Sequence, residues 1–193
     1  MLAECSFVVW DFDLTILRIH AFGEGVTVND ITARWEADVA DVELFRSFVL
    51  TALANGICVG IASFGRAEVI LAYLQHIFAG TDAPSAFTAE NIATPAALDI
   101  PGVTDGVSLP NGKPLLLEVL CTRANPPVTQ RSSVLFFDDD INNVEDALVA
   151  GFTRSHHCAS GFQRAVVQTL LQSSQSSQSS HAAAGKRSAC ILT

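Results

Sequence analysis

The chain has 193 residues, a length that favours one domain with appendages over two full domains. Its composition is 49% hydrophobic and 16% charged, which is typical of a chain that folds around a core and excludes an intrinsically disordered one. With 20 acidic against 11 basic residues the net charge is −9, and this disfavours a nucleic-acid scaffold because a negative protein repels the phosphate backbone.

The sequence lacks the usual marks of a membrane or secreted protein. No run approaches the roughly 18 uninterrupted apolar residues of a spanning helix. The N-terminus has no basic stretch leading into an apolar segment and a small-residue cleavage site. The five cysteines are odd in number and form no CxxC pair, which indicates free thiols in a reducing compartment. These features predict a cytoplasmic protein.

Short apolar runs alternate with segments of helical spacing over the first 150 or so residues. In chain order we predict a strand at 7–10, a helix at 42–53, a strand at 57–61, a helix from 69 that ends at Gly80, a helix that begins at Pro114, a strand at 134–137 and a helix from Asn143 to about Gly151. The alternation predicts an α/β fold, a three-layer Rossmann-like core with a mostly parallel sheet and helices on both faces. Such sheets bind ligands at the carboxyl ends of their strands.

Two segments differ from this pattern in composition. Residues 91–112 are rich in prolines and other turn formers, and we predict a loop near the site there. Residues 172–180 read QSSQSSQSS, a low-complexity run with no apolar face to bury. We therefore predict a folded domain over residues 1–172 and a flexible Ser/Gln-rich tail over residues 173–193.

The last four residues, Cys190 to Thr193, fit the C-a-a-X pattern of prenylated proteins, although threonine lies outside the usual set at the final position. Cys190 is therefore a candidate prenylation site. One prenyl group beside Lys186 and Arg187 predicts only a weak membrane association, since each basic residue adds about 1 kcal/mol at an anionic surface. The alternative is a chance match at an unmodified terminus.

Clusters of aspartates follow two of the predicted strands: Asp11 and Asp13 come after the first, and Asp138, Asp139 and Asp140 after the third. Residues i and i+2 of an extended strand share a face, so the first pair is expected to point into one pocket. Parallel pairing of the two strands would bring all five carboxylates together. Their mutual repulsion calls for a cation, and Mg²⁺ prefers oxygen ligands. The alternative is helix capping, above all by Asp140.

A hydroxyl and a lysine complete the set of candidate residues. The second predicted strand ends at Ser63, and Gly65 follows, so side-chain and backbone donors are available for an anion. Lys113 is the only lysine before the tail and precedes Pro114, where its point charge is placed to meet a phosphate or the carboxylates. The alternative for Lys113 is an ordinary solvated lysine.

In this order, these residues resemble the four signature motifs of the haloacid dehalogenase-like (HAD) superfamily of phosphohydrolases. The DxDxT motif matches residues 11–15, the hydroxyl motif matches Ser63, the lysine motif matches Lys113-Pro114, and the acidic motif matches DDDINNVEDA at 138–147. The resemblance covers about residues 5–170. The first and fourth motifs are specific, whereas the second is a single hydroxyl.

The resemblance implies a HAD core fold and a Mg²⁺-dependent phosphomonoester hydrolase that works through an aspartyl-phosphate intermediate. It implies Asp11 as nucleophile and Asp13 as general acid and base, with Ser63 and Lys113 completing the catalytic set. The implied substrate-binding residues are Thr15, Ser63, Gly65 and Lys113. The implied Mg²⁺ ligands are Asp11, Asp13 through its backbone carbonyl, Asp138 and Asp139.

Two features narrow the activity that the resemblance implies. Asp13 favours a phosphatase over a dehalogenase, because an alkoxide leaving group needs a proton and a halide does not. The segments between motifs have no obvious room for a large cap domain, which in this family goes with an open site and with macromolecular substrates such as phosphoproteins. Small phosphoesters also stay open as substrates, and so does the oligomeric state.

Two other functions compete with this reading. The first is a scaffold that keeps the fold and binds Mg²⁺ and phosphate without turnover. The second is a receiver domain, which also places acids, a hydroxyl and a lysine on a parallel sheet. The order of motifs argues against a receiver domain, because here the DxDxT motif comes first and the triple aspartate last.

Overall fold

The computed structural model describes residue 2 and residues 4–169 of the chain. These residues divide into two compact units, one of residues 2–163 and one whose described part is the helical segment 164–169. The sheet and the candidate site lie within the first unit. The predicted tail at 173–193, with Cys190, lies outside the described residues, as does the predicted boundary at 172.

The centre of the unit is a five-stranded, all-parallel sheet. Its strands are β1 (Phe7–Trp10), β2 (Cys58–Ala62), β3 (Ile92–Ala93), β4 (Val134–Asp138) and β5 (Arg154–His157), in the spatial order β3-β2-β1-β4-β5. This 3-2-1-4-5 order is that of the Rossmann-type doubly wound fold, and it differs from the 2-1-3-4-5 order of flavodoxin-like sheets, to which receiver domains belong. The chain is therefore α/β, as the alternating pattern predicted, and it does not have the receiver topology.

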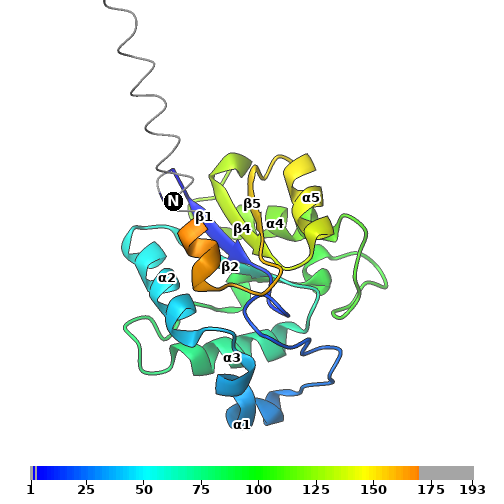
Figure 1. Ribbon diagram of the computed structural model, residues 1–193. Helices are drawn as coiled ribbons and strands as arrows, with labels where there is room; N and C mark the ends of the chain where they lie inside the picture. The colour runs from blue at the N-terminus through cyan, green and yellow to red at the C-terminus, as the bar shows by residue number, and fades with distance from the viewer. Residues whose placement is uncertain (1, 3, 170–193) are drawn as a thin grey trace, which may run out of the picture. The chain divides into compact units, whose positions relative to one another are not determined.

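Helices cover both faces of the sheet (Figure 1). They are α1 (Val28–Asp38), α2 (Val42–Ala54), α3 (Ala67–Phe78), α4 (Gly112–Arg123) and α5 (Ile141–Val149). Short 3₁₀ turns occur at Ala89–Asn91, Pro95–Leu98 and Arg131–Ser133. Helices α4 and α5 pack on one face of the sheet and α2 and α3 on the other, with α1 packed on α3. The three layers of the predicted fold are thus present.

Alternation along the central strands separates two cores. Phe7 and Val9 of β1 point into a cluster with the leucines of α4, whereas Trp10 points to the other face. There it lies in edge-to-face contact with Phe45 and Phe48 of α2, at ring-centroid distances of 5.2 and 5.8 Å. Both clusters are fully buried, so β1 is covered on both faces, as its uninterrupted apolar run predicted.

Three elements are additions to the predicted pattern. Helix α1 lies in a stretch of low hydrophobicity in which only Ile31 and Asp38 are buried. Strand β3 is two residues long and lies inside the segment predicted as a loop. Strand β5 reads RSHH, without an apolar run, and lies at the edge of the sheet. The predicted helix at Pro114 begins two residues earlier, at Gly112.

Two sequence-based expectations about the environment can be compared with the described residues. Cys5, Cys58, Cys121 and Cys158 are all free thiols. None of the helices in the described part of the chain is both long enough and apolar enough to cross a bilayer.

Candidate active site

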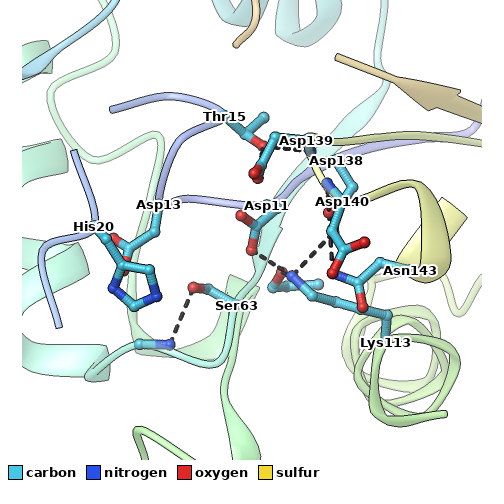
Figure 2. A network of polar contacts seen from close by, with 12 residues as sticks. Asp11, Asp13, Thr15, His20, Ser63, Lys113, Asp138, Asp139, Asp140 and Asn143 are labelled. Carbon is cyan, nitrogen blue, oxygen red and sulfur yellow. Dashed lines mark hydrogen bonds and ion pairs between the residues drawn. The ribbon is translucent and has the colours of Figure 1, made fainter. Parts of the chain in front are cut away.

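A cleft of about 290 Å³ opens at the carboxyl ends of β1, β2 and β4, the edge at which the fold predicts a ligand site. Its walls come from four segments that are far apart in the sequence: the turn after β1, the end of β2, the loop and first turn of α4, and the residues after β4. Figure 2 shows the polar side chains that meet there. The predicted site residues that line the cleft are Asp11, Asp13, Ser63, Gly65, Lys113 and Asp139.

Lys113 joins the three strand ends. Its ammonium group donates a short hydrogen bond to Asp11 Oδ1 and a second one, 2.8 Å long, to the carbonyl oxygen of Ala62 at the end of β2. Asp138 Oδ2 lies 3.1 Å from the same nitrogen. The side chain is 1% exposed, so the alternative of a solvated surface lysine is wrong. Lys113 is a buried cation shared by two carboxylates.

The two carboxylate oxygens of Asp138 have different partners. Its Oδ1 accepts hydrogen bonds from the backbone N–H of Asp140 at 2.9 Å and from Asn143 Nδ2 at 3.0 Å. Its Oδ2 is buried and accepts no hydrogen bond among the described residues, although Lys113 Nζ is close enough for an ion pair. A buried carboxylate oxygen that accepts no hydrogen bond destabilises the folded state unless a further positive group lies against it.

Thr15 and Asp139 form a reciprocal pair. Thr15 Oγ1 donates to Asp139 Oδ1 at 3.0 Å and accepts from the Asp139 backbone N–H at 3.0 Å. Thr15 is fully buried and is not among the residues that line the cleft. The structure therefore gives Thr15 a contact that orients Asp139, and its predicted contact with substrate stays a prediction.

Three of the five predicted carboxylates converge. Oxygen atoms of Asp11, Asp138 and Asp139 lie within 4.8 Å of one another. Asp140 caps helix α5 by accepting from the backbone N–H of Asn142 at 2.9 Å, as its alternative role predicted, and it lines the rim of the cleft. Asp13 lines the same cleft but stands apart from the cluster (Figure 2).

Asp13 stands apart because the chain turns just beyond the end of β1. A turn begins at Asp13, and Leu14 has the left-handed φ of 59°. Asp13 Oδ2 then accepts from the backbone N–H of Phe22 at 3.3 Å and lies 3.2 Å from His20 Nδ1. The carboxyl group is held by the segment that follows it, on the wall of the cleft opposite Lys113 (Figure 2).

The end of β2 forms the floor beside Lys113. Ser63 is 1% exposed, and its Oγ accepts from the backbone N–H of Gly65 at 3.1 Å. A serine hydroxyl that accepts one hydrogen bond can still donate another. Ser63 therefore offers a hydroxyl donor in the same cleft that Lys113 lines.

Burial dominates the electrostatics of the site. It raises the pKa of the Asp11 carboxyl well above its ordinary value, while the Lys113 ammonium lowers that pKa and the Asp138 carboxylate adds to the rise. Burial also raises the pKa of Asp13 and of Asp139, against hydrogen bonds from the Phe22 N–H and the Thr15 hydroxyl. Burial lowers the pKa of Lys113, but Asp11 and Asp138 outweigh it and hold that pKa above its usual value. Lys113 therefore stays charged, and the site carries an excess of carboxylates.

The donor set fits a hard divalent cation. Three carboxylates converge, every candidate ligand atom is oxygen, and one buried oxygen of Asp138 accepts no hydrogen bond. Mg²⁺ binds through one or two carboxylates and keeps several waters, which suits a cluster that opens into a cleft. Asp11, Asp138 and Asp139 are the side chains that could hold it, and the backbone carbonyl of Asp13 stays a predicted ligand.

Several cleft residues were not singled out as site residues from the sequence. They are His20 and Phe22 from the segment after β1, and Gly106 and Ser108 from the loop before α4. The prediction that residues 91–112 form a loop near the site covered Gly106 and Ser108, and no sequence signal pointed to His20 or Phe22. Phe64 also lines the cleft, and its place directly after Ser63 is the signal that points to it. Arg18 and Arg66, which follow the first two motifs closely, donate to the backbone carbonyls of Ala40 and Val26 and do not line the cleft.

In comparisons with known proteins, no family model matches this sequence and no curated protein matches it with significance. The functional argument therefore rests on the chemistry of the site.

Proposed function

We propose that the protein is a Mg²⁺-dependent phosphomonoester hydrolase of the HAD type, with Asp11 as its nucleophile. The observation that carries the proposal is the meeting of Asp11 with a fully buried lysine from 102 residues away, inside a cluster of three carboxylates. A buried ammonium and an uncompensated carboxylate cluster are both costly for stability. Their cost is explained if the lysine and a divalent cation together neutralise a phosphate ester beside Asp11.

The first half-reaction would transfer the phosphoryl group to the protein. An oxygen of the Asp11 carboxylate attacks phosphorus, a new phosphorus–oxygen bond forms, and the bond to the leaving alcohol breaks. The alcohol oxygen takes a proton from Asp13. The raised pKa of Asp13 favours this role, because it keeps the carboxyl group protonated at a higher pH than an ordinary aspartate.

The second half-reaction would release phosphate. Asp13, now a carboxylate, takes a proton from a water molecule that attacks phosphorus, and the bond to Asp11 breaks. Inorganic phosphate leaves and both aspartates return to their starting states. The position of Asp13 across the cleft from Lys113 supports this sequence, because the same carboxyl can serve the leaving alcohol and the incoming water from one side (Figure 2).

The remaining groups would bind the phosphoryl oxygens. Lys113 Nζ and the Ser63 hydroxyl are fixed donors in the floor of the cleft, and Gly65 lines it beside them. When bound by Asp11, Asp138 and Asp139, Mg²⁺ supplies positive charge that offsets the repulsion between these carboxylates and a phosphate. Catalysis then depends mostly on positioning and electrostatics.

The test is the release of inorganic phosphate from phenyl phosphate. We expect release with Mg²⁺, none after EDTA, and recovery when excess Mg²⁺ is restored. Asp11→Asn nearly keeps the shape of the side chain and should lose the activity. Asp82→Asn is the matched control, because Asp82 is exposed and does not line the cleft.

Three results would contradict the proposal. Activity that persists in EDTA would exclude the metal role, and activity that survives Asp11→Asn would exclude the nucleophile. Binding of Mg²⁺ and phosphate with no release from any phosphomonoester would instead favour the scaffold function.

A further inference from the structure

The proposed function places the leaving group of the substrate against the wall of the cleft that carries Asp13, because Asp13 gives the proton. That wall contains His20 and Phe22, and the Phe22 backbone N–H donates to the Asp13 carboxyl at 3.3 Å. Phe64 lines the same cleft beside the floor residue Ser63. Besides these three rings, Leu14 is the remaining large apolar side chain of the lining, so most large side chains that a leaving group could contact are aromatic.

Glycines let the backbone approach both phenylalanine rings closely. A Cβ atom at Gly106 would lie 2.0 Å from Phe22 Cζ, and a Cβ atom at Gly112 would lie 2.8 Å from Phe64 Cε1. Each ring also has a cation over one face, Arg66 for Phe22 and Lys113 for Phe64. Phe22 is 40% exposed and lines the cleft, so part of its side chain is available to a ligand. An aromatic ring offers contact area at a lower entropy cost than a flexible side chain does.

The charge of the lining is one-sided. Four carboxylates line the cleft, from Asp11, Asp13, Asp139 and Asp140, and Lys113 is the only lysine or arginine among the lining residues. Lys113 is already engaged by Asp11 and Asp138. Arg66 does not line the cleft: its guanidinium carbon lies 5.8 Å from the Phe22 ring centroid, and it donates to the Val26 carbonyl. His20 lines the cleft, but its Nδ1 lies 3.2 Å from the Asp13 carboxylate. Within the described lining, a second anionic group on the substrate would therefore meet carboxylates and no lysine or arginine that is not already engaged.

From these observations we infer the substrate class of this site: a phosphomonoester of an aromatic alcohol that carries no further negative charge. The inference rests on the proposed function for the place of the leaving group. The cleft volume agrees with it, because about 290 Å³ is at the low end of ligand pockets and suits a phosphoryl group with one ring. Bisphosphates, nucleotides and sugar phosphates lack either the ring at this position or the neutral leaving group.

Binding to the Asp11→Asn protein in Mg²⁺, measured by calorimetry, tests the class without turnover. Phenyl phosphate and cyclohexyl phosphate differ mainly in the aromatic face. We expect phenyl phosphate to bind about three- to tenfold more tightly, the range that one aromatic contact supplies. In the Asp11→Asn protein, the further substitution Phe22→Leu should abolish this preference for phenyl phosphate, whereas Phe22→Tyr, which keeps an aromatic ring, should retain it.

A second pair of ligands tests the charge. 4-Carbamoylphenyl phosphate and 4-carboxyphenyl phosphate have nearly the same shape, and the carboxylate should bind about three- to tenfold more weakly because the rim is acidic. Adding Asp140→Asn removes one rim charge and keeps a residue that caps helices well, so the difference should narrow.

The outcomes separate this inference from the proposed function. Equal or reversed binding within either pair, or no binding of any aryl phosphate, overturns the inference even if the wild-type protein releases phosphate from alkyl esters. Absence of phosphate release from every ester overturns the proposed function, while the binding preferences still decide the ligand class. The affinity for a phosphotyrosine peptide with uncharged flanking residues, compared with that for phenyl phosphate, then distinguishes a phosphoprotein from a free aryl phosphate as the ligand.

Discussion

Trp10 and Asp11 are neighbours in the sequence, yet they belong to regions of opposite character, and the same is true of Phe137 and Asp138. Trp10 and Phe137 stack on each other inside the aromatic cluster on the α2 side of the sheet, with ring centroids 6.1 Å apart. Asp11 and Asp138 follow directly and share the buried ammonium of Lys113. One region buries rings, and the other buries charge.

The two regions contribute to stability with opposite signs. Burial of a large aromatic side chain stabilises a fold by about 1.5–3 kcal/mol or more. Burial of carboxylates destabilises it unless they are neutralised, and among the described residues three carboxylates converge where one lysine pairs with two of them. In β1 and β4, the last apolar residue packs in the core, and the residue that follows it belongs to the site. Substitutions on the two sides of this boundary should therefore have different consequences.

The largest expected effect is on activity. Asp11→Asn should lower kcat/KM by about 10³-fold or more, because an amide is not a nucleophile. In metal-free buffer its free energy of unfolding should equal or exceed that of the wild type, since one of the carboxylates that share Lys113 is removed. Urea unfolding in EDTA measures the second effect. A large loss of stability would show that the Asp11–Lys113 pair serves the fold.

The opposite pattern is expected on the aromatic side. Phe45→Ala removes a ring that contacts Trp10 and should lower the free energy of unfolding by about 3–5 kcal/mol. The kcat/KM of the folded fraction should stay within about threefold of the wild type, because α2 lies outside the cleft lining. Phe45→Leu provides the milder control. A loss of activity that exceeds the unfolded fraction would mean that the two regions are coupled.

Binding of Mg²⁺ should offset the destabilisation that the clustered carboxylates cause. A ligand that binds only the folded state at 100 times its Kd stabilises that state by about 2.7 kcal/mol. We expect a gain of this order on addition of Mg²⁺, measured by urea unfolding, and its loss in Asp138→Asn. Phe45→Leu should keep the full response, because it leaves the carboxylates intact. An equal response in Asp138→Asn would remove Asp138 from the metal site.

The stability of the metal-free protein should depend on pH through the site. Burial raises the pKa of Asp11, Asp13 and Asp139 in the folded state. A carboxyl with a raised folded pKa contributes stability that is fully present below its ordinary pKa of 3.8 and is lost as pH rises through the folded value. The raised pKa of Lys113 makes the stability depend on pH only above its usual value of 10.5, well above the pH range in which the carboxyl groups begin to lose protons.

The measurement is the difference in unfolding free energy between the wild type and Asp11→Asn in EDTA from pH 4 upward. The wild type should lose stability relative to the variant as pH rises, by no more than about 1.4 kcal/mol per pH unit for one proton. Saturating Mg²⁺ should weaken this trend, because the cation favours the ionised carboxylates. A difference that does not change with pH would argue against the raised pKa of Asp11.

The fold was predictable where strands carry apolar runs. β1, β2 and β4 were predicted within about one residue, and they are the strands that carry the site. Strand β5 was missed because an edge strand that reads RSHH leaves no apolar signal. Helix α1 buries few side chains, and its only strong signal was the capping box of Thr27 and Asp30 at its start.

The site was predictable in its members more than in its geometry. The positions of Asp11 and Asp138 at strand ends predicted that they meet, since parallel strands end at the same edge, and Lys113 contacts both. Asp11 and Asp13 line one cleft, as expected. The turn after β1 places Asp13 on the wall opposite Lys113, however, and no local pattern in the sequence predicts that separation.

The smallest expected effect concerns Thr15, the motif residue whose place differs most from expectation. Thr15→Val keeps the buried shape but removes both hydrogen bonds to Asp139. The Asp139 side chain should then be less well oriented within the carboxylate cluster. Partners that orient metal ligands typically contribute 10- to 100-fold in metal affinity or activity. We expect Mg²⁺ affinity, from the Mg²⁺ dependence of phosphate release, to fall about tenfold, with recovery in Thr15→Ser. An unchanged Mg²⁺ affinity with a raised KM would instead assign Thr15 to the substrate, as the motif predicted.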